Sequence, residues 1–574
     1  LYNDAVAMTG GQPVDGTLSV PQIAHQVRSE GVHTIVLLSD DIAKWNKREL
    51  FPSDMEFHDR KELDAVQKRL REVKGTSVLI FDQTCATEKR RRRKRGKMVD
   101  PQKRVMVNTL VCEGCGDCGK KSFCVSVLPK ETEFGRKREI DQSNCNKDYS
   151  CVNGFCPSFV TVEGGGLKKK KASSAKDRLN NLPLPPMPSL DQPWNILITG
   201  VGGTGVVTIG ALLGMAGHLE GKGASVLDQT GLAQKGGAVT THIRIAKTPA
   251  DIHAVRIAAG EADLVLGCDM VVVNDYWALS KVRAGRSQVV LNSYEAMPGT
   301  FTTRPDMQFP ATDIVAAIKQ ALGGQDPLIV DATQLATALL GDAIATNLFI
   351  LGYAWQRSLV PISFEALMRA IELNGAAIEM NKTAFAWGRL AAIDPQTVAE
   401  AAGVTRKVQT AAEATPRDLP HLAPGEWEGN EWGATSAPRA TRNEDELRHV
   451  PARADSDNLA FLPLDDLRLS RSLDELISRR VAFLTEYQDA AYAQRYANFV
   501  GKVREAEQQR APGSTDLAEA VARYFFKLMA YKDEYEVARL YTSGEFKRRL
   551  DQQFDGDYKL KFHLAPPLLA KKDA

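Results

Sequence analysis

The sequence predicts an α/β protein of several domains whose last part is α-helical. Three observations carry this prediction. The chain has 574 residues, which is too long for a single hydrophobic core. Strand-like and helix-like segments alternate in residues 1–83 and again after residue 193, as in parallel sheets with helical crossovers. From about residue 440 onward the chain is charged and has helical periodicity.

The composition is that of a soluble globular protein, with 43% hydrophobic and 25% charged residues. The net charge of +2 neither favours nor excludes a polyanionic partner. No run reaches the roughly 18 apolar residues that span a membrane, so we expect a cytoplasmic protein without a membrane partner. The chain begins with Leu1 and inside a domain-like pattern, so we expect it to be a piece of a longer protein.

Residues 1–83 predict the end of an α/β domain. The first strand and a Gly/Pro-rich loop are expected in LYNDAVAMTGGQPVDG. VPQIAHQVRSEG predicts a helix, HTIVLLSD a buried strand, and TSVLIFDQ a last strand after a second helix. The basic run EKRRRRKRGK follows, from Glu88 to Lys97. It fits a docking site for an acidic electron carrier or a helix end packed on a neighbouring domain, and without interleaved aromatics we expect no nucleic acid partner.

Seven of the nine cysteines lie between Cys112 and Cys156. Disulfides, zinc and an iron–sulfur cluster all use such residues, but a disulfide scaffold is typically short and secreted. Structural zinc sites usually have two separated C-x2-C pairs. Here three cysteines stand at i, i+3 and i+6, and a remote cysteine precedes a proline, which favours a [4Fe–4S] cluster on Cys112, Cys115, Cys118 and Cys156.

The glycines around these cysteines fit the same interpretation. Gly114, Gly116 and Gly119 allow the loop to turn its amides toward the sulfur atoms. The spacing departs from the ferredoxin pattern, because five residues rather than three separate the third and fourth cysteines. Three cysteines remain for a second cluster, completed by Asp117 or another residue: Cys124, Cys145 and Cys151.

A glycine-rich turn follows a linker at residues 164–192. NILITGVGGTGVVTIG predicts a strand, a loop and a helix, and the loop glycines are Gly200, Gly202, Gly203 and Gly205. The next strand ends at Asp228, which fits a dinucleotide site with an acid for the ribose. An ordinary glycine-rich turn that binds no nucleotide fits equally well.

Further strands are expected in ADLVLG, QVVLNS and PLIVDA, after a tight turn at Lys235, Gly236 and Gly237. Residues 345–390 predict helices, and FEALMRAIELNG has the spacing of an amphipathic surface helix. No metal-ligand spacing occurs near the C-terminus, and we expect His563 to be a core or interface residue.

The order of these motifs resembles that of the long, fused indolepyruvate ferredoxin oxidoreductases of the 2-oxoacid:ferredoxin oxidoreductase family. NDAVAMTGGQP, the cysteine segment, and GVGGTGVVTIG with GLAQKGGAVTTHIR are each similar to a family motif. The resemblance covers essentially the whole chain. It implies the C-terminal part of a thiamine diphosphate-binding domain at 1–100, an iron–sulfur segment at 101–163 that is ferredoxin-like, a Rossmann-like γ-type catalytic domain at 193–415, and a mostly helical domain at 416–574.

The same resemblance implies an enzyme that decarboxylates an aryl 2-oxo acid, such as indolepyruvate, to its acyl-CoA and passes the electrons to ferredoxin. Its cofactors would be thiamine diphosphate, Mg²⁺ and one or two [4Fe–4S] clusters, in a homo-oligomer. The Asn3 side chain and the Ala5 carbonyl would ligate Mg²⁺, and Met8, Thr9 and Gly10 would lie under the thiamine. The upstream half of that site precedes this chain in the family, so we expect the chain alone to be inactive.

Two other functions remain open on the sequence. An NAD(P)-dependent reductase would use the glycine loop and Asp228, with the cluster as a relay. An iron–sulfur electron-transfer module would need neither thiamine nor nucleotide. No individual catalytic residue is identified.

Overall fold

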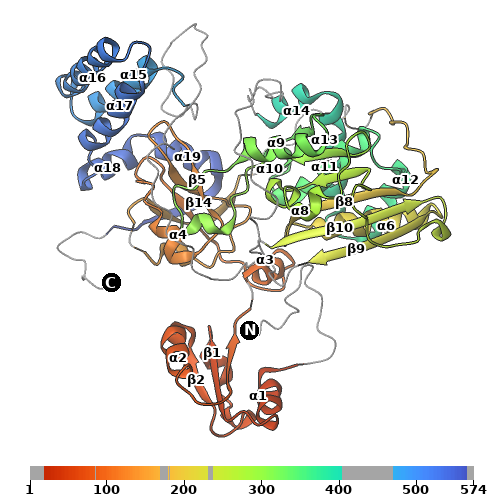
Figure 1. Cartoon of the computed structure of the whole chain (residues 1–574). Helices are drawn as coiled ribbons and strands as arrows, with labels where there is room; N and C mark the ends of the chain where they lie inside the picture. The colour runs from red at the N-terminus through yellow and green to blue at the C-terminus, as the bar shows by residue number, and fades with distance from the viewer. Residues whose placement is uncertain are drawn as a thin grey trace. The chain divides into compact units, whose positions relative to one another are not determined.

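The computed structural model describes residues 18–84, 86–154, 156–168, 179, 181–230, 237–403 and 469–564 (Figure 1). The chain divides into two compact units. The first unit consists of Leu1–Pro129, Arg138–Thr405 and Leu550–Ala574, and the second of Lys130–Lys137 and Arg406–Arg549. Among the described residues no helix is both long and apolar enough to cross a bilayer.

A small parallel sheet forms the N-terminal part of the first unit. Its strand order is β2-β1-β3, with β1 at Thr34–Ser39, β2 at Glu56–Asp59 and β3 at Ser77–Asp82. Alternate residues of β1 enter two different cores, because successive side chains of a strand point to opposite faces. Ile35 and Leu37 pack with helix α1, Val20–Ser29. Val36 and Leu38 pack with helix α2, Leu63–Leu70.

These elements confirm the parallel α/β arrangement expected for residues 1–83. Both helices and the strands in HTIVLLSD and TSVLIFDQ form where the periodicity predicts them. Strand β2 was not expected, because its EFHD segment is polar and only half-buried at the sheet edge. The segment LYNDAVAMTGGQPVDG lies outside the described residues.

The cysteine segment is built on antiparallel strands. Strands β4, Lys103–Val107, and β7, Phe159–Leu167, pair with each other, and β7 extends into the range expected to be a linker. A hairpin, β5 at Val127–Lys130 and β6 at Lys137–Ile140, adds a second small sheet. Between the strands lie a short helix, α4 at Asp117–Ser122, and a 3-10 turn, η4 at Ser150–Val152.

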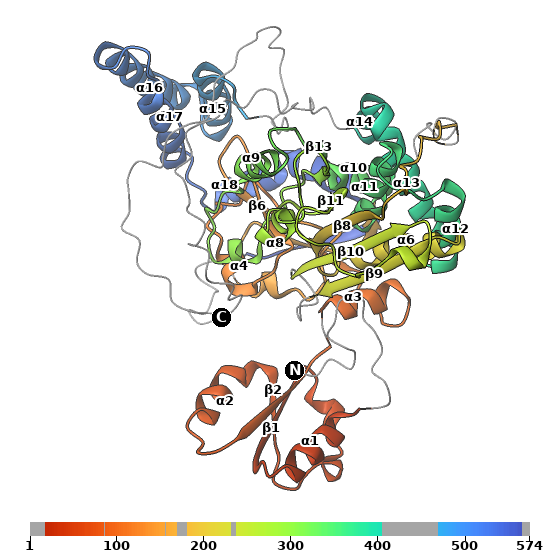
Figure 2. The same ribbon diagram turned by 45° about the vertical axis from the view of Figure 1, so that its right-hand side comes forward.

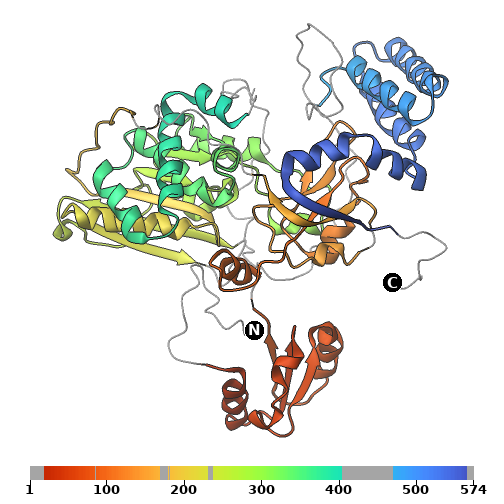
Figure 3. The ribbon, with the colours of Figure 1, turned by 180° about the vertical axis from the view of Figure 1, so that it is seen from behind.

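The third strand of this sheet comes from the far end of the chain. Strand β14, Phe554–Phe562, pairs antiparallel with β7, so that the order is β14-β7-β4. Figure 3 shows the blue β14 beside the orange strands of the cysteine segment. The C-terminal region is therefore not helical throughout. His563 lies just beyond β14, where its Nε2 and the Thr161 hydroxyl are 2.9 Å apart, as expected for an interface residue.

The largest domain is a six-stranded mixed sheet with helices on both faces (Figure 2). The strand order is β13-β12-β11-β8-β10-β9, in which β10 runs antiparallel to both of its neighbours. The strands are β8 at Trp194–Val201, β9 at Gly223–Thr230, β10 at Ala238–Ala246, β11 at Leu264–Gly267, β12 at Gln288–Asn292 and β13 at Leu328–Val330. All of the strands expected in this domain form.

Strand β8 shows why both faces must be covered. Its Ile196 and Ile198 lie in one core, and Leu197 between them lies in the other. The first core is completed by α6 at Val206–Leu219, α10 at Ala332–Leu340, α11 at Thr346–Gln356, α12 at Phe364–Asn374, α13 at Ile378–Ile393 and α14 at Pro395–Ala402. The second is completed by α7 at Met270–Val273, α8 at Tyr276–Leu279 and α9 at Ala311–Ala321.

Three helices of the C-terminal region begin at side chains that cap them. Ser472, Asp489 and Asp533 each accept a hydrogen bond from the backbone amide three residues later, which satisfies an amide that the helix leaves unbonded. The helices are α15 at Leu473–Tyr487, α16 at Ala490–Arg510, α17 at Asp516–Met529, α18 at Glu534–Thr542 and α19 at Glu545–Gln553.

The second unit is centred on a buried ion pair. Arg480 of α15 is 2% exposed and pairs with Glu133, which lies at the tip of the β5–β6 hairpin and is 8% exposed. The guanidinium also donates to the Glu133 carbonyl at 2.7 Å. Next to this pair, the Phe134 ring packs between Phe483 and Phe526, with centroids 5.0 and 5.4 Å away. The hairpin tip therefore belongs to the core of the helical unit.

Removing the carboxylate of this pair should loosen the helical unit. Glu133→Gln leaves the Arg480 cation buried without its counter-charge, a change that typically costs about 3–5 kcal/mol. We expect faster hydrogen exchange in peptides from α15 and α17 of the full-length chain. Glu131→Gln is the matched control, since the exposed Glu131–Arg136 pair is worth at most about 1 kcal/mol. Equal exchange in both variants would contradict this account.

Candidate functional site

The thiamine diphosphate residues predicted from the sequence lie outside the described residues. These are Asn3, Ala5, Met8, Thr9 and Gly10. Their roles stay predictions. The structure does describe every cysteine predicted to bind a cluster, and all four glycines of the glycine-rich loop.

Six of the seven clustered cysteines are wholly or partly buried. Cys112 and Cys151 are 7% and 8% exposed and share a small core with Val105, Val127 and other apolar residues. Cys118, Cys124 and Cys156 pack against this core, Cys145 is half-buried, and Cys115 is exposed. None of the eight cysteines that the structure describes forms a disulfide, so the disulfide alternative fails for them.

Electrostatic coupling places the predicted cluster ligands near one another. Burial, together with the nearby thiols of Cys112 and Cys156, raises the pKa of Cys118 to about 11. Burial also raises the pKa of Cys156, where the Cys112 and Cys115 thiols add to the rise and hydrogen bonds with Ser158 oppose it. The thiols of the set predicted for one cluster, Cys112, Cys115, Cys118 and Cys156, are thus near enough to act on one another electrostatically.

The remaining cysteines form a second neighbourhood. Burial and the nearby thiols of Cys124 and Cys145 raise the pKa of Cys151 to about 12. Burial raises the pKa of Cys145 as well, and the Cys124 thiol adds to it. Asp117, the residue expected to complete this second site, occupies the first turn of α4 and pairs with Lys121 at 2.9 Å, and its role stays a prediction.

The first cysteine loop runs from Cys112 to Cys118, and its backbone is turned toward the Cys112 sulfur. The Gly114 amide donates to the Cys112 Sγ at 3.3 Å, and Gly114 and Gly116 adopt φ values of 73° and 77° that favour glycine. A Cβ on Gly116 would stand 2.6 Å from the Pro305 Cβ. Any residue larger than glycine at position 116 would therefore displace Pro305.

A buried cation beside the loop lacks a partner for one of its donors. Arg138 of β6 is 3% exposed and donates through Nη2 to the Pro305 carbonyl at 3.0 Å. Among the described residues its buried Nη1 has no hydrogen-bond acceptor, although its charge acts on the Cys118 thiol. Such orphaned donors are rare in folded proteins. Thiolate ligands, inward amides and an unsatisfied guanidinium all fit an anionic iron–sulfur cluster.

The cysteines do not converge on a point. Among the described residues, no three Cys, His, Asp or Glu side chains are close enough together to ligate a single metal ion. In a cluster each thiolate binds a different iron, so its ligands surround a volume.

The basic run packs on the second cysteine loop, which runs from Cys145 to Cys151. It forms helix α3, Ala86–Lys94, in which Arg90 donates to the Ser143 carbonyl at 3.1 Å and Arg93 to the Asn146 carbonyl at 2.6 Å. Two more of its arginines, Arg91 and Arg92, pair with Glu88 inside the helix. These contacts favour the packing interpretation of the run over a free docking surface.

The glycine loop joins β8 to α6 as the sequence predicts. Gly200 is the next-to-last residue of the buried strand, where a Cβ would stand 2.5 Å from Val206 Cγ2, so a larger residue would displace the helix. Gly203 and Gly205 have φ values of 86° and 99°. The Gly202 amide donates to the Gly237 carbonyl at 2.7 Å, which joins the loop to β10; Lys235 and Gly236 lie outside the described residues.

The strand order around this loop differs from that of a dinucleotide site. There the acid that binds the ribose ends the strand directly beside the glycine-loop strand. Here β10 lies between β8 and β9 and runs antiparallel to both. Asp228 of β9 accepts a hydrogen bond from the Thr241 hydroxyl at 2.6 Å, so its carboxylate is bound to the neighbouring strand.

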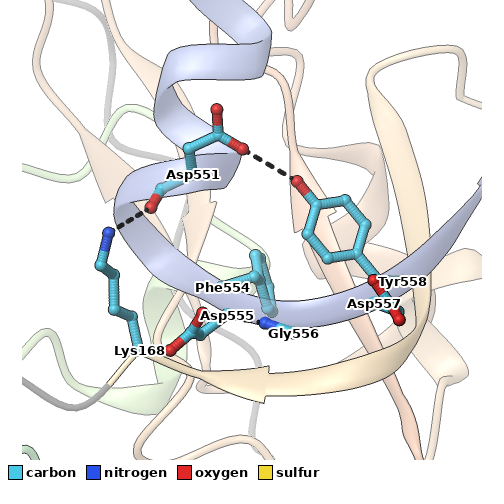
Figure 4. Close-up of a pocket in the computed structure, with 7 residues that line it drawn as sticks. All are labelled: Lys168, Asp551, Phe554, Asp555, Gly556, Asp557 and Tyr558. Carbon is cyan, nitrogen blue, oxygen red and sulfur yellow. Dashed lines mark hydrogen bonds between the residues drawn. The ribbon is translucent and has the colours of Figure 1, made fainter.

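A pocket lies where β14 bends against β7 (Figure 4). Its polar groups bond to each other: Lys168 donates to the Asp551 carbonyl at 3.0 Å, and the Tyr558 hydroxyl to the Asp551 carboxylate at 3.1 Å. Its lining contains none of the cysteines and none of the glycine-loop residues. We assign it no chemistry.

Comparison with known proteins identifies the glycine-loop domain. Residues 195–391 match the family described as pyruvate ferredoxin/flavodoxin oxidoreductase, and residues 473–574 match a family of unknown function, DUF6537. The chain is 28% identical over 194 residues to indolepyruvate oxidoreductase subunit IorB of Methanothermobacter thermautotrophicus, covering 33% of this chain and 94% of that protein. The IorB subunit of Pyrococcus horikoshii is 28% identical over 201 residues, covering 35% and 96%.

This domain resembles the 2-oxoacid:ferredoxin oxidoreductase family. The expected resemblance to that family is confirmed for residues 195–391. Two solved structures are similar to part of the chain. The PORC subunit of Thermotoga maritima pyruvate oxidoreductase has a TM-score of 0.26 at 18% identity, covering 35% of this chain and 96% of that one. The γ subunit of a Geobacter sulfurreducens keto/oxoacid ferredoxin oxidoreductase has a TM-score of 0.25 at 19% identity, covering 35% and 98%.

Sequence reasoning missed two arginines that lie against the cysteine segment, Arg138 and Arg93. Both lie among other basic residues, and nothing local distinguishes a cation that turns inward from one in solvent. The signal is in the fold: Arg138 stands on a strand beside the cysteine loop, and Arg93 ends on a carbonyl next to Cys145.

The strand order predicts that the glycine loop does not serve a nicotinamide cofactor. We expect no NAD(H) binding in the micromolar range by fluorescence titration of the full chain. Gly202→Val is the control, because it would fill the loop that a pyrophosphate would need to approach. Micromolar binding by the natural chain that disappears in Gly202→Val would contradict this expectation.

Proposed function

We propose that this chain is the electron-transfer and γ-type part of a 2-oxoacid:ferredoxin oxidoreductase that acts on an aryl 2-oxo acid such as indolepyruvate. The observation that carries the proposal is that the thiols of Cys112, Cys115, Cys118 and Cys156 lie near enough to act on one another electrostatically, in the same chain as the domain that matches the family. The domain's curated relatives are indolepyruvate oxidoreductase subunits, which supports the aryl substrate.

In this proposal the four thiolates hold one [4Fe–4S] cluster, which supplies one-electron transfer when bound. The chain's own groups prepare the site for its charge. Arg138 places an unsatisfied guanidinium donor next to Cys118, and the Gly114 amide donates to the Cys112 sulfur. Hydrogen bonds and positive charge at the sulfurs stabilise the reduced state of such a cluster. Burial of Cys112 keeps water from that ligand.

The reaction also needs a group that stabilises the carbanion formed on decarboxylation, a role that thiamine diphosphate plays in enzymes. We assign its diphosphate and Mg²⁺ to Asn3 and Ala5, with Met8, Thr9 and Gly10 beneath the cofactor. Coenzyme A would accept the acyl group, and ferredoxin the electrons, in a homo-oligomeric cytoplasmic enzyme. The proposed domains are those expected from the sequence, with β14 added to the iron–sulfur segment.

An iron–sulfur electron-transfer module with an NAD(P)-binding domain is the second candidate. It shares the cysteine segment but needs a working dinucleotide site. The insertion of β10 between β8 and β9 and the Asp228–Thr241 hydrogen bond weigh against that site. The 2-oxoacid oxidoreductase is therefore the function we favour.

Cys115→Ala tests the cluster at its exposed corner. Because Cys115 is exposed, its loss should leave the core intact, yet the cluster would lose one of its four ligands. We expect chain purified without oxygen to contain iron and acid-labile sulfide, and the variant to lose the content of one cluster. Cys268→Ala, at a buried cysteine of the β8–α6 core, should retain the full content. Stoichiometric zinc without sulfide in the natural chain would overturn the proposal.

Asn3→Ala tests the thiamine diphosphate assignment independently. Removing a side-chain oxygen from a near-octahedral Mg²⁺ site should weaken binding of the diphosphate, with partial rescue by excess Mg²⁺. The assay is thiamine diphosphate titration of a chain extended by the upstream half of the family's site. Iron and sulfide content should not change. Cofactor affinity and turnover at the natural level in Asn3→Ala would show that this segment has another role.

A further inference from the structure

The second cysteine loop repeats the backbone of the first. In the first loop the Gly114 amide donates to the Sγ of Cys112, two residues earlier, at 3.3 Å. In the second loop the Lys147 amide donates to the Sγ of Cys145, again two residues earlier, at 3.4 Å. Each loop therefore begins with a cysteine whose sulfur accepts from the amide of residue i+2.

The two loops also share their left-handed residues. Gly114 and Gly116, at i+2 and i+4, have φ values of 73° and 77°. Lys147 and Tyr149, at the same positions of the second loop, have φ values of 53° and 62°. Positive φ is unfavourable for residues with a side chain, so the second loop adopts this path at a cost in backbone strain. This strain indicates that the second loop has a specific requirement for this backbone path.

A short helix follows at the same point of each loop. The residue at i+4, Gly116 or Tyr149, is the left-handed residue that precedes the helix. Helix α4 then begins at Asp117, and η4 at Ser150. The cysteine at i+6 lies within that helix in both cases, as Cys118 and Cys151.

One position breaks the repeat in residue type. The residue at i+3 is Cys115 in the first loop and Asp148 in the second, and both are exposed. Asp148 is close enough to Cys145 and Cys151 for its charge to act on both thiols. The Ser150 hydroxyl donates to the Asp148 Oδ2 at 3.1 Å, which orients the carboxylate within the loop.

We propose that Asp148 is the fourth ligand of a second iron–sulfur cluster, whose other ligands are Cys124, Cys145 and Cys151. The register of the two loops places its carboxylate where the first loop places the Cys115 thiolate. The inference rests on the proposed function in one respect, that the cysteine segment binds iron–sulfur clusters at all. It replaces Asp117, whose place at i+5 in the first loop corresponds to Ser150 and not to a ligand.

An oxygen ligand gives this cluster a distinct chemistry. Iron in a cluster prefers soft thiolates, and carboxylates are harder ligands. The iron on Asp148 would therefore be the most easily lost. Ferricyanide would take one electron from the resting cluster, one Fe²⁺ would leave, and three irons with four sulfides would remain on the three cysteines. The first cluster, with four thiolates, would resist the same treatment.

The test compares reconstituted full-length variants before and after brief ferricyanide oxidation, by iron and sulfide analysis and by electron paramagnetic resonance. The natural chain should develop the signal of a three-iron cluster. Asp148→Cys should lower this signal several-fold, because the labile iron gains a thiolate. Asp148→Ala should show the three-iron signal already before oxidation, because its cluster holds no fourth iron that must first be released. Asp117→Asn, an exposed aspartate of the first loop, should behave like the natural chain.

A reciprocal variant makes the comparison independent of the second loop. Cys115→Asp gives the first loop the ligand type of the second, so it should add a second population of oxidisable clusters. If Asp148→Cys and Asp148→Ala both match the natural chain in signal and iron content, the inference is wrong while the first cluster stands. If the natural chain takes up iron without any acid-labile sulfide, the proposed function itself fails.

Discussion

The burial of several thiols in a very small core is the constraint on which the cysteine segment depends. The apolar side chains there are few: Val105, Val107, Val127 and Phe159 share the core with Cys112 and Cys151. So few apolar groups bury little surface, and small domains of this kind usually need covalent or metal cross-links. The left-handed residues in its loops add backbone strain, which further lowers the stability of the segment. Ligand binding to the thiols would supply folding free energy directly.

The surroundings of the segment hold its loops from outside. Arg90 and Arg93 of α3 donate to carbonyls at 143 and 146, on either side of Cys145. Arg138 donates to the Pro305 carbonyl beside the first loop, and Gly119 of α4 approaches the Thr302 carbonyl closely. Strand β14 closes the sheet beneath through its pairing with β7. These arginines, which the sequence alone would place on a surface, therefore hold the cysteine loops through hydrogen bonds to backbone carbonyls.

Local sequence patterns predicted the helices, strands and turns that depend only on neighbouring residues. The helices at 20–29 and 364–374, the buried strands β1 and β8 and the glycine turn all form where periodicity and spacing place them. Long-range pairing was not predictable. Strand β14 follows helices in a charged region and finds its partner nearly four hundred residues earlier. The position of β10 between β8 and β9, which separates Asp228 from the glycine loop, depends on pairing that no single segment encodes. Asp148 was visible at the i+3 position, but only the matching backbone gives that spacing its meaning.

Mössbauer spectroscopy of the anaerobically reconstituted full-length chain tests the central claim most directly, because it resolves each kind of iron by its ligands. The account predicts iron in two clusters per chain: one in which all irons have thiolate ligands, and one in which a single iron has the parameters of oxygen ligation. In Asp148→Cys that single iron should take the parameters of the others. A spectrum of mononuclear iron, or of one cluster that Asp148 does not affect, would contradict the account.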